Sequence, residues 1–436
     1  MLERYFDLAG RGTNVRTELV AGLTTFLTMA YIVVVNPAIL GTTGMPVAAV
    51  AAATCLAAAF GCILMGLVAN YPLAMAPGMG LNAYFTFTVV KGMGVPWETA
   101  LGCVFLSGVA FLLLTAVGVR QLIIGALPRW LFSAVGGGVG LFIAFIGLAD
   151  AGIIVAKPGT MVGLGSLTAP GAAVSLFGIV LIAALQVRRI KGAMLLGILL
   201  TAALGWAVGL GHMAPGGHSL ADLSATMGKL DIRGALNLKG GIGMSLLEIV
   251  FVFLFVDLFD NVGTLVAVTR NAGLMAKDGS VPRLNRILVV DSLAMAAGAI
   301  AGTSPVTSYI ESASGVTAGG RTGLTAVVVG LLFLVTLFFA PLVQAIPASA
   351  TAPALILVGA MMLGTLAEVD WNEPAAAIPA FVTVVMIPLS FSIANGLAFG
   401  ITTYALLKLV NGEARRSDWL VYVLAALFVA RFIYIA

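Results

Sequence analysis

Charged residues are scarce in this chain, and their scarcity excludes a soluble globular protein. Asp, Glu, Lys and Arg make up 9% of the 436 residues, whereas a soluble domain contains about a quarter. Hydrophobic residues make up 61%. The small excess of basic over acidic residues, 22 against 18, therefore bears on membrane topology and does not indicate a nucleic-acid partner. The composition predicts an integral membrane protein whose surroundings are the lipid bilayer.

Cysteine and histidine are also rare, which removes most kinds of metal and redox site. Cys55 and Cys62 lie seven residues apart on one predicted helix, and Cys103 lies in another apolar segment. None has a histidine nearby, so we expect all three to be packing residues. The two histidines lie in the polar stretch 211–239. We find no nucleophile–base pair and no phosphate-binding glycine loop, and we expect neither an enzyme nor a cofactor.

Long apolar segments are plentiful, and they fall into two series of seven. Each segment is near the length needed to cross about 30 Å of hydrocarbon. The first segment is too long for a signal-peptide core, so we interpret it as a retained span. The 53 glycines are typical of helices that pack closely in a membrane. The predicted spans are 19–40, 47–69, 73–90, 99–119, 130–149, 172–187 and 193–210, followed by 244–268, 287–301, 303–318, 325–341, 351–367, 375–391 and 397–410.

The distribution of basic residues predicts the orientation of these spans. With the N-terminus in the cytoplasm, most Lys and Arg residues fall on the cytoplasmic side, as the positive-inside rule requires. The outer loops then contain only Lys91, Lys157, Lys229, Arg233 and Lys239. We therefore expect a multi-pass protein of the cell membrane with a cytoplasmic N-terminus. The apolar end of the tail, 419–436, is either an interfacial helix or an additional span.

Two of the predicted spans are interrupted by proline. Pro305 lacks a backbone donor and lies among Thr, Ser and Gly residues, so the apolar run 287–300 should continue as an extended segment. Pro77 interrupts the third span in a similar way, close to half a chain earlier. Because seven is odd, the second series must enter the membrane inverted relative to the first. Inverted repeats with discontinuous helices are typical of secondary transporters, which bind substrate at the membrane midplane.

Several carboxylates lie within the predicted spans. Glu311 follows Pro305 at hydrocarbon depth, where an acid is a functional-site hypothesis by default. Asp257 and Asp260 lie three residues apart on one helix face, with Thr264 one turn further on. Two carboxylates so close in a low dielectric repel each other, so we expect at least one to hold a proton. The alternative, that either aspartate only bonds to a neighbouring helix and stabilises the fold, remains open.

The other membrane acids carry weaker predictions. Glu248 lies on the face of the helix opposite Asp257, while Asp150 and Asp291 lie near the ends of their spans, which favours solvated or helix-capping roles.

These motifs resemble the nucleobase–cation symporter-2 superfamily, the nucleobase–ascorbate transporters, and within it the AzgA-like purine permeases. The resemblance covers nearly the whole chain. It is carried by Asn36-Pro37, Ala76-Pro77-Gly78-Met79-Gly80-Leu81-Asn82-Ala83-Tyr84-Phe85, Asp257-Leu258-Phe259-Asp260-Asn261-Val262-Gly263-Thr264-Leu265 and Thr307-Ser308-Tyr309-Ile310-Glu311-Ser312. It implies an all-α membrane protein of about fourteen spans in a 7+7 inverted repeat, with short extended segments in spans 3 and 10.

The resemblance also implies domains, a mechanism and partners. The implied parts are a cytoplasmic N-terminus (1–18), a core domain (19–119 and 244–341), a gate domain (130–210 and 342–410), an external loop (211–243) and a tail (411–436). The core would move against the gate as an elevator, within a homodimer, and would import a purine nucleobase together with protons as the coupling ion.

Carried over residue by residue, the resemblance implies a binding site. Asp260 and Glu311 look like the acids that bind the base, and Asn82 matches an asparagine of this branch. The backbone of Tyr309 and Ile310 should contact the substrate, and Asp257 is the first choice for proton coupling. Where uracil and xanthine carriers have His or Asp after the acid of span eight, this chain has Thr264. The supporting residues are Thr264, Pro77, Pro305 and Ser312.

The chemistry of a purine agrees with this site. A purine is a flat disc with N–H donors and N or O acceptors, which needs carboxylates and amides to bond and a ring to stack on. Phe259 and Tyr309 are stacking candidates, although core packing is an equally ordinary role for them. The alternatives are a xanthine or uracil transporter, an anion carrier of the same architecture, or a channel. An anion carrier would want a positive site, and a channel would not need opposed acids in interrupted helices.

Overall fold

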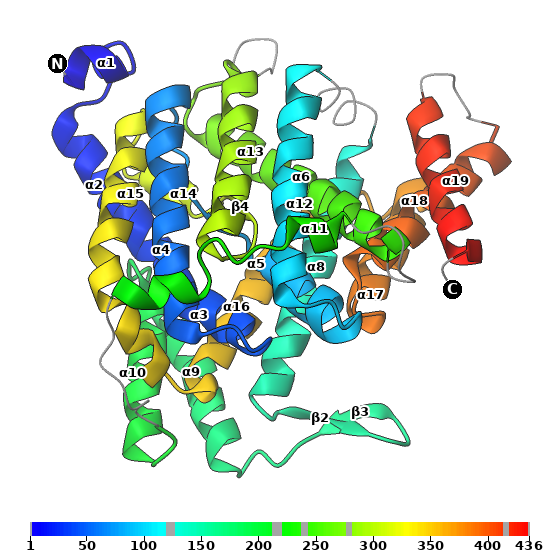
Figure 1. The fold of residues 1–436 in the computed structure, drawn as a ribbon, viewed down its shortest axis with the longest axis horizontal. Helices are drawn as coiled ribbons and strands as arrows, with labels where there is room; N and C mark the ends of the chain where they lie inside the picture. The colour runs from blue at the N-terminus through cyan, green and yellow to red at the C-terminus, as the bar shows by residue number, and fades with distance from the viewer. Residues whose placement is uncertain are drawn as a thin grey trace.

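The computed structural model describes residues 2–118, 127–211, 220–236, 243–275, 281–412 and 418–434, and the protein is mainly helical, as predicted (Figure 1). The elements of the first half are α1 (Leu2–Phe6), α2 (Val15–Met29), α3 (Ile32–Gly41), α4 (Val47–Leu64), η1 (Met65–Ala69), β1 (Met75–Pro77), α5 (Met79–Ala83), η2 (Tyr84–Gly92), α6 (Trp97–Ala116), α8 (Arg129–Asp150), β2 (Ile154–Lys157), β3 (Met161–Leu164), α9 (Pro170–Val187) and α10 (Ala193–Ala207).

The second half follows the same order of spans. Its elements are η3 (Leu220–Ala225), α11 (Ile232–Ala235), α12 (Gly243–Asn271), α13 (Leu284–Ala301), β4 (Val306–Ser308), α14 (Ser312–Thr317), α15 (Gly323–Thr336), η4 (Leu337–Ala345), α16 (Ala348–Leu363), η5 (Gly364–Glu368), α17 (Pro374–Leu389), α18 (Ile393–Val410) and α19 (Trp419–Tyr434).

The helices agree with the predicted spans to within a few residues. Among the described residues, eight helical segments are long and apolar enough to cross a membrane, and shorter apolar helices cover 193–207, 323–339, 374–389 and 419–430. The first predicted span consists of α2 and α3, separated at Ala30 and Tyr31. The tail forms α19, which packs against α18 and is joined to it by an ion pair between Lys408 and Asp418 at 2.6 Å. The β2–β3 hairpin was not expected from the sequence.

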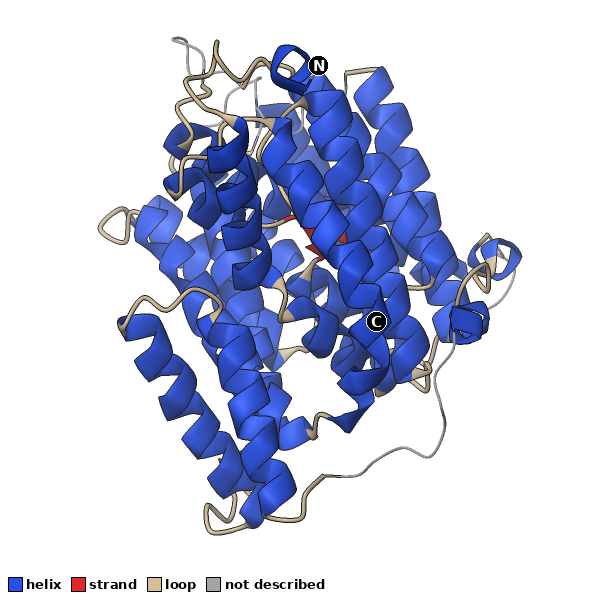
Figure 2. Ribbon diagram, turned by 90° about the vertical axis from the view of Figure 1, so that its left-hand side faces the viewer, coloured by secondary structure: helices blue, strands red, loops and turns tan. Residues whose placement is uncertain are grey.

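Two predicted spans are not continuous helices, and their extended segments pair with each other. Strands β1 and β4 run antiparallel, with Met75 opposite Ser308 and Pro77 opposite Val306. Figure 2 shows these strands in the middle of the molecule, enclosed by helices. Every residue of both strands is buried. The prediction of extended segments at the two prolines is confirmed, and the pairing joins the two halves of the chain.

The backbone around the two strands is bonded within the protein. Gly302 ends α13 in the left-handed region, with φ of +93°, so the chain can leave the helix directly before the strand. The Gly78 N–H donates to the Pro305 carbonyl at 2.9 Å, and the Tyr309 hydroxyl donates to the Pro77 carbonyl at 2.5 Å. The Ser312 hydroxyl accepts from the Ala74 N–H at 2.9 Å. Extended backbone is tolerated at this depth because protein groups satisfy it.

The helices pack in two groups. The strand group comprises α2 to α6 and α12 to α15 with β1 and β4, and its helices from the two halves interleave, as where α15 packs on α2 and α4. The flanking group comprises α8, α9, α10, α16, α17 and α18, in which α16 packs on α8 and α9. The groups meet where α8 contacts α5 and α12, where α16 contacts α3, and where α10 contacts α2.

Close helix packing in the strand group depends on glycine. At the contact between η1 and α15, a Cβ at Gly66 would lie 2.4 Å from the Gly323 carbonyl oxygen, and a Cβ at Gly323 would lie 2.1 Å from the Gly66 oxygen. Neither distance is compatible with a side chain, so both backbones approach as closely as they do because both residues lack one.

We expect Gly66→Ala to lower the free energy of unfolding by about 1–3 kcal/mol, because the methyl group would force these two backbones apart. The measurement is thermal unfolding of the purified protein in detergent. Gly171→Ala is the control, since nothing lies within 4 Å of a Cβ at that position. Equal stability of the two variants would contradict the close approach.

Tyr309→Phe tests the hydrogen bonding around the paired strands β1 and β4. The variant leaves the buried Pro77 carbonyl without this donor, so we expect a loss of about 1–3 kcal/mol of stability. Tyr5→Phe removes a similar bond to the Leu67 carbonyl at an exposed position and should cost much less. Comparable losses in the two variants, measured by the same unfolding assay, would show that burial does not matter at Tyr309.

Candidate functional site

A cavity of about 500 Å³ lies between the strand group and the flanking group. Its walls come from α8 and α16 on one side and from α5, α12 and the start of α14 on the other. Most of its lining is apolar. The lining residues are Gly80, Phe132, Ser133, Val135, Gly136, Val139, Val256, Asp260, Thr264, Ile310, Glu311, Val358, Met361, Met362, Thr365 and Glu368.

Two predicted acids, one from α12 and one from the end of the crossed strands, line this cavity. Asp260 lies beside the start of α5, where a Cβ on Gly78 would be 3.5 Å from its Oδ2. Glu311 precedes α14, and its Oε1 accepts a hydrogen bond from the Tyr31 hydroxyl at 2.7 Å. Both are enclosed by protein rather than turned to lipid. The structure therefore brings Asp260 and Glu311 together at the crossing of the two inverted halves.

Asn82 lies close to this site but is not among the residues that line the cavity. Its side chain is fully buried and lies within hydrogen-bonding distance of the Ser304 hydroxyl. Ser304 also donates to Asn36 Oδ1 at 3.2 Å. The Asn36 amide donates in turn to Thr54 and Thr303, both at 2.8 Å. Asn82 thus belongs to a buried polar network that ties α3, α4 and α5 to the segment before β4. Its contact with substrate stays a prediction.

The other predicted site residues divide into lining and supporting positions. Ile310 and Thr264 line the cavity, and Ile310 is half exposed. Tyr309 does not line it, because its ring is buried and its hydroxyl bonds to Pro77. Ser312 is also buried and bonds to the Ala74 N–H. The carbonyl of Pro305 bonds to Gly78.

Asp257 is fully buried and lies outside the described lining of the cavity. The side chain of Phe259 lies outside the described residues, so its predicted stacking role stays a prediction. Asp150 is exposed at the end of α8, as expected. Asp291 is fully buried; the expectation of a solvated acid near a helix end was wrong, because α13 begins earlier than predicted and is packed between α4 and α6.

Most of the cavity-lining residues were not found from the sequence, and neither was Tyr31, the partner of Glu311. Tyr31 bonds to Glu311, which lies 280 positions away in the chain, and no local sequence pattern predicts such a pair. Phe132 is an aromatic residue of the cavity wall. Ser133 donates to Glu368 Oε2 at 2.9 Å, which places a third carboxylate on the wall contributed by the flanking group. Glu368 lies just beyond the predicted span 351–367, where an acid looks like an ordinary loop residue.

The geometry favours a flat, neutral ligand that donates hydrogen bonds. Apolar residues of α8 and α16 form most of the wall, and the polar groups that converge on the cavity include three carboxylates. Carboxylates accept hydrogen bonds, and an enclosed apolar slot favours a ring over a hydrated ion. The described residues contain no group of His, Cys, Asp and Glu suited to a metal ion.

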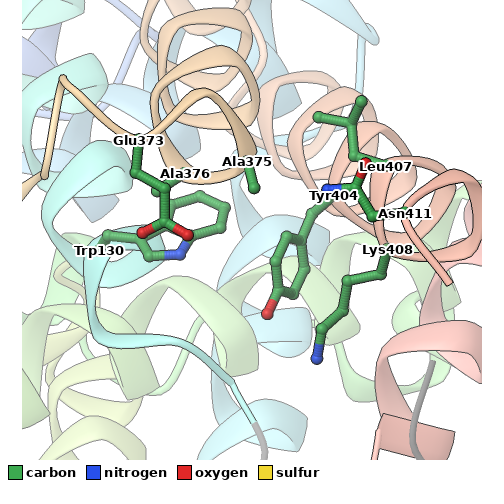
Figure 3. Close-up of a pocket in the computed structure, with 8 residues that line it drawn as sticks. All are labelled: Trp130, Glu373, Ala375, Ala376, Tyr404, Leu407, Lys408 and Asn411. Atoms are coloured by element: carbon green, nitrogen blue, oxygen red, sulfur yellow. The ribbon is translucent and has the colours of Figure 1, made fainter. Parts of the chain in front are cut away.

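A smaller cavity of about 230 Å³ lies at the ends of α8, α17 and α18. Figure 3 shows the Glu373 carboxylate beside the Trp130 ring, with Tyr404 and Lys408 next to them. Trp130 and Tyr404 pack edge to face, with ring centroids 5.1 Å apart. Lys408 is paired with Asp418 and lies over the Tyr404 ring. These interactions of Trp130, Tyr404 and Lys408 are those of a contact between helix ends.

Comparison with known proteins identifies the family. The permease family model Xan_ur_permease matches residues 16–399. The adenine permease AdeP of Escherichia coli (strain K12) is 46% identical over 435 residues, covering 100% of this chain and 96% of that protein. The guanine/hypoxanthine permease PbuG of Bacillus subtilis (strain 168) is 44% identical over 444 residues, covering 100% of both.

Among solved structures, the transmembrane domain of the cyanobacterial bicarbonate transporter BicA superposes with a TM-score of 0.64 at 16% identity, covering 89% of this chain and 97% of that chain. This likeness concerns the fold alone, and it confirms the predicted architecture of two inverted repeats of seven spans. The sequence matches extend over the whole chain at much higher identity. The chain therefore belongs to the nucleobase–ascorbate transporter family of permeases.

Proposed function

We propose that this permease imports purine nucleobases, adenine, guanine or hypoxanthine, together with protons across the cell membrane. The observation that carries the proposal is that Asp260 and Glu311, from two distant segments, line one apolar cavity at the crossing of β1 and β4. The names of the relatives support purines as the substrate class. A base in the cavity would donate its N–H groups to these carboxylates and lie against the apolar walls, with Phe132 as a ring to stack on.

The two helix groups would serve as the parts that move. In this proposal the strand group is the core that carries the base, and the flanking group is the gate. The interface between them is largely apolar at the cavity, where Gly80 packs against Val139 so closely that a Cβ would lie 2.6 Å from its Cγ1. Such an interface suits an elevator movement of the core, within a homodimer, with the N-terminus in the cytoplasm.

We assign proton coupling to Asp260 and Glu311, the two acids that would bind the base. Asp260 and Glu311 lie in apolar surroundings at a shared cavity, where two negative charges would repel and a proton on one relieves the repulsion. Binding of the base and binding of the proton are thereby linked at one site. Asp257, the first choice from the sequence, lies outside the described lining of the cavity, and its part in coupling stays a prediction.

Uptake of labelled adenine, guanine and hypoxanthine by cells lacking their own carriers tests this function. We expect saturable uptake of at least one base, abolished by a protonophore. Glu311→Gln should lower the rate at least about tenfold, because it removes a charged hydrogen-bond acceptor and the proton site together. Asp150→Asn, at an exposed helix end, is the control. The proposal would be refuted if neither the protonophore nor Glu311→Gln lowered the rate of uptake. Transport of bicarbonate or sulfate in place of a base would also refute it.

The cavity wall contributed by the flanking group gives a separate prediction. If Glu368 accepts an N–H from the base, Glu368→Gln should raise the KM for uptake about tenfold and leave expression unchanged. Ser133→Ala should raise it less, because it removes only the donor that orients Glu368. Glu373→Gln, in the smaller cavity, is the matched control. An unchanged KM in the Glu368 variant would exclude this carboxylate from substrate binding.

A further inference from the structure

Glu311 borders a second cavity as well as the proposed substrate cavity. The second cavity has a volume of about 620 Å³ and is lined by α2, α14 and the turn between α9 and α10. Glu311 and Met361 are the residues that the described linings of the two cavities have in common. The carboxylate therefore borders two separate spaces, and the second has five hydroxyl side chains in its lining.

The hydroxyl groups of the second cavity form two facing rows. Thr24 and Thr28 lie one turn apart on α2, with Tyr31 following at the start of α3. Ser314 and Thr317 follow Glu311 at successive steps of three residues along α14. The rows meet where the Thr28 and Ser314 hydroxyls lie 3.1 Å apart. At the inner end Tyr31 bonds to the Glu311 carboxylate at 2.7 Å, and Ser314 bonds to the Glu311 carbonyl at 2.5 Å.

Exposure falls inward along the α14 row, where Thr317 is exposed and Ser314 and Glu311 are partly buried. On the α2 row Thr28 is partly buried, between Thr24 at 5% and Tyr31 at 2% exposure. A hydroxyl both donates and accepts, so a row of hydroxyls with water between them can pass a proton by exchanging hydrogen bonds. A cavity of about 620 Å³ has room for several waters beside these hydroxyls. The α14 row thus runs from the exposed Thr317 to Glu311 outside the substrate cavity, and Thr28 joins it at Ser314.

Two basic residues line this cavity. Arg189 and Lys191 lie on the turn between α9 and α10, both exposed, and Lys191 donates to the Thr24 hydroxyl at 3.2 Å. Positive groups in this position repel other cations such as sodium. The remaining titratable groups that face Glu311 are Tyr31 and, on the substrate side, Asp260, Glu368 and Tyr309.

We propose that this hydroxyl-lined cavity is the route by which the coupling proton leaves Glu311, separate from the route taken by the base. The inference rests on the proposed function. In the step itself, the Glu311 carboxylic acid transfers its proton to an adjoining hydroxyl or water. The Thr28 and Ser314 hydroxyls then relay a proton toward the protein surface at Thr317. Glu311 is left as a carboxylate. Thr28 is a positioning and relay residue that does not contact the base.

The test compares two kinds of transport by the full-length protein in liposomes. One is adenine uptake driven by a pH gradient, alkaline inside, with an internal pH dye reporting proton entry. The other is exchange of labelled for unlabelled adenine at equal pH, which needs no net proton movement. We expect Thr28→Val to lower gradient-driven uptake and proton entry about tenfold while leaving exchange unchanged. Thr28→Ser retains the hydroxyl and should behave as the original protein.

Thr336→Val is the control, because the Thr336 hydroxyl bonds within its own helix, to Leu332, and lies outside the cavity. Equal effects of Thr28→Val on uptake and exchange, or an effect on neither, would overturn the separate route while leaving proton-coupled transport intact. Exchange without gradient-driven uptake in the unmutated protein would instead remove proton coupling, and the route with it. The Ser314→Ala variant should reproduce the result for Thr28→Val.

Discussion

The structure depends on satisfying the backbone of two broken spans in the middle of the membrane. An N–H or carbonyl group left unpaired in hydrocarbon costs several kcal/mol, so neither β1 nor β4 could exist there alone. Each supplies the partner for the other: the strands pair antiparallel, and Tyr309 and Ser312 bond the carbonyl of Pro77 and the N–H of Ala74. The two halves of the chain are therefore bound together at the point where a ligand can reach both.

Buried polar side chains extend this constraint away from the strands. Asn36 and Asn82 meet Ser304, so α3, α4 and α5 are held against the segment that leads into β4. Glu18 shows that a buried acid can be purely structural. It accepts bonds from the backbone of Arg321 and Thr325 at the start of α15 and is fully buried. Asp260 and Glu311 differ because they line a cavity that crosses the boundary between two helix groups.

At the boundary between the two helix groups, substrate binding would be coupled to movement of the strand group. One wall of the cavity belongs to the group that contains the strands, and the other belongs to α8, α16 and η5. A base bound to Asp260 and Glu311 would travel with the first wall, and Ser133 and Glu368 on the second wall would meet it in only part of the cycle. Glu311, bordered by the hydroxyl-lined cavity on its other side, would exchange protons without opening the path of the base.

The sequence by itself determined the membrane class, the two series of spans and the positions of the two breaks. Each of these follows from local properties: apolar length, proline without a donor, and an odd number of spans that forces inversion. It also singled out Asp260 and Glu311, because charged residues are so rare in such spans. Tertiary structure alone decided that Asn82 bonds inside the scaffold, that Asp257 lies outside the described lining of the cavity, that Tyr31 bonds to Glu311, and that Glu368 lines the cavity. Those outcomes depend on contacts between positions up to 280 residues apart, which side-chain spacing along a single helix cannot encode.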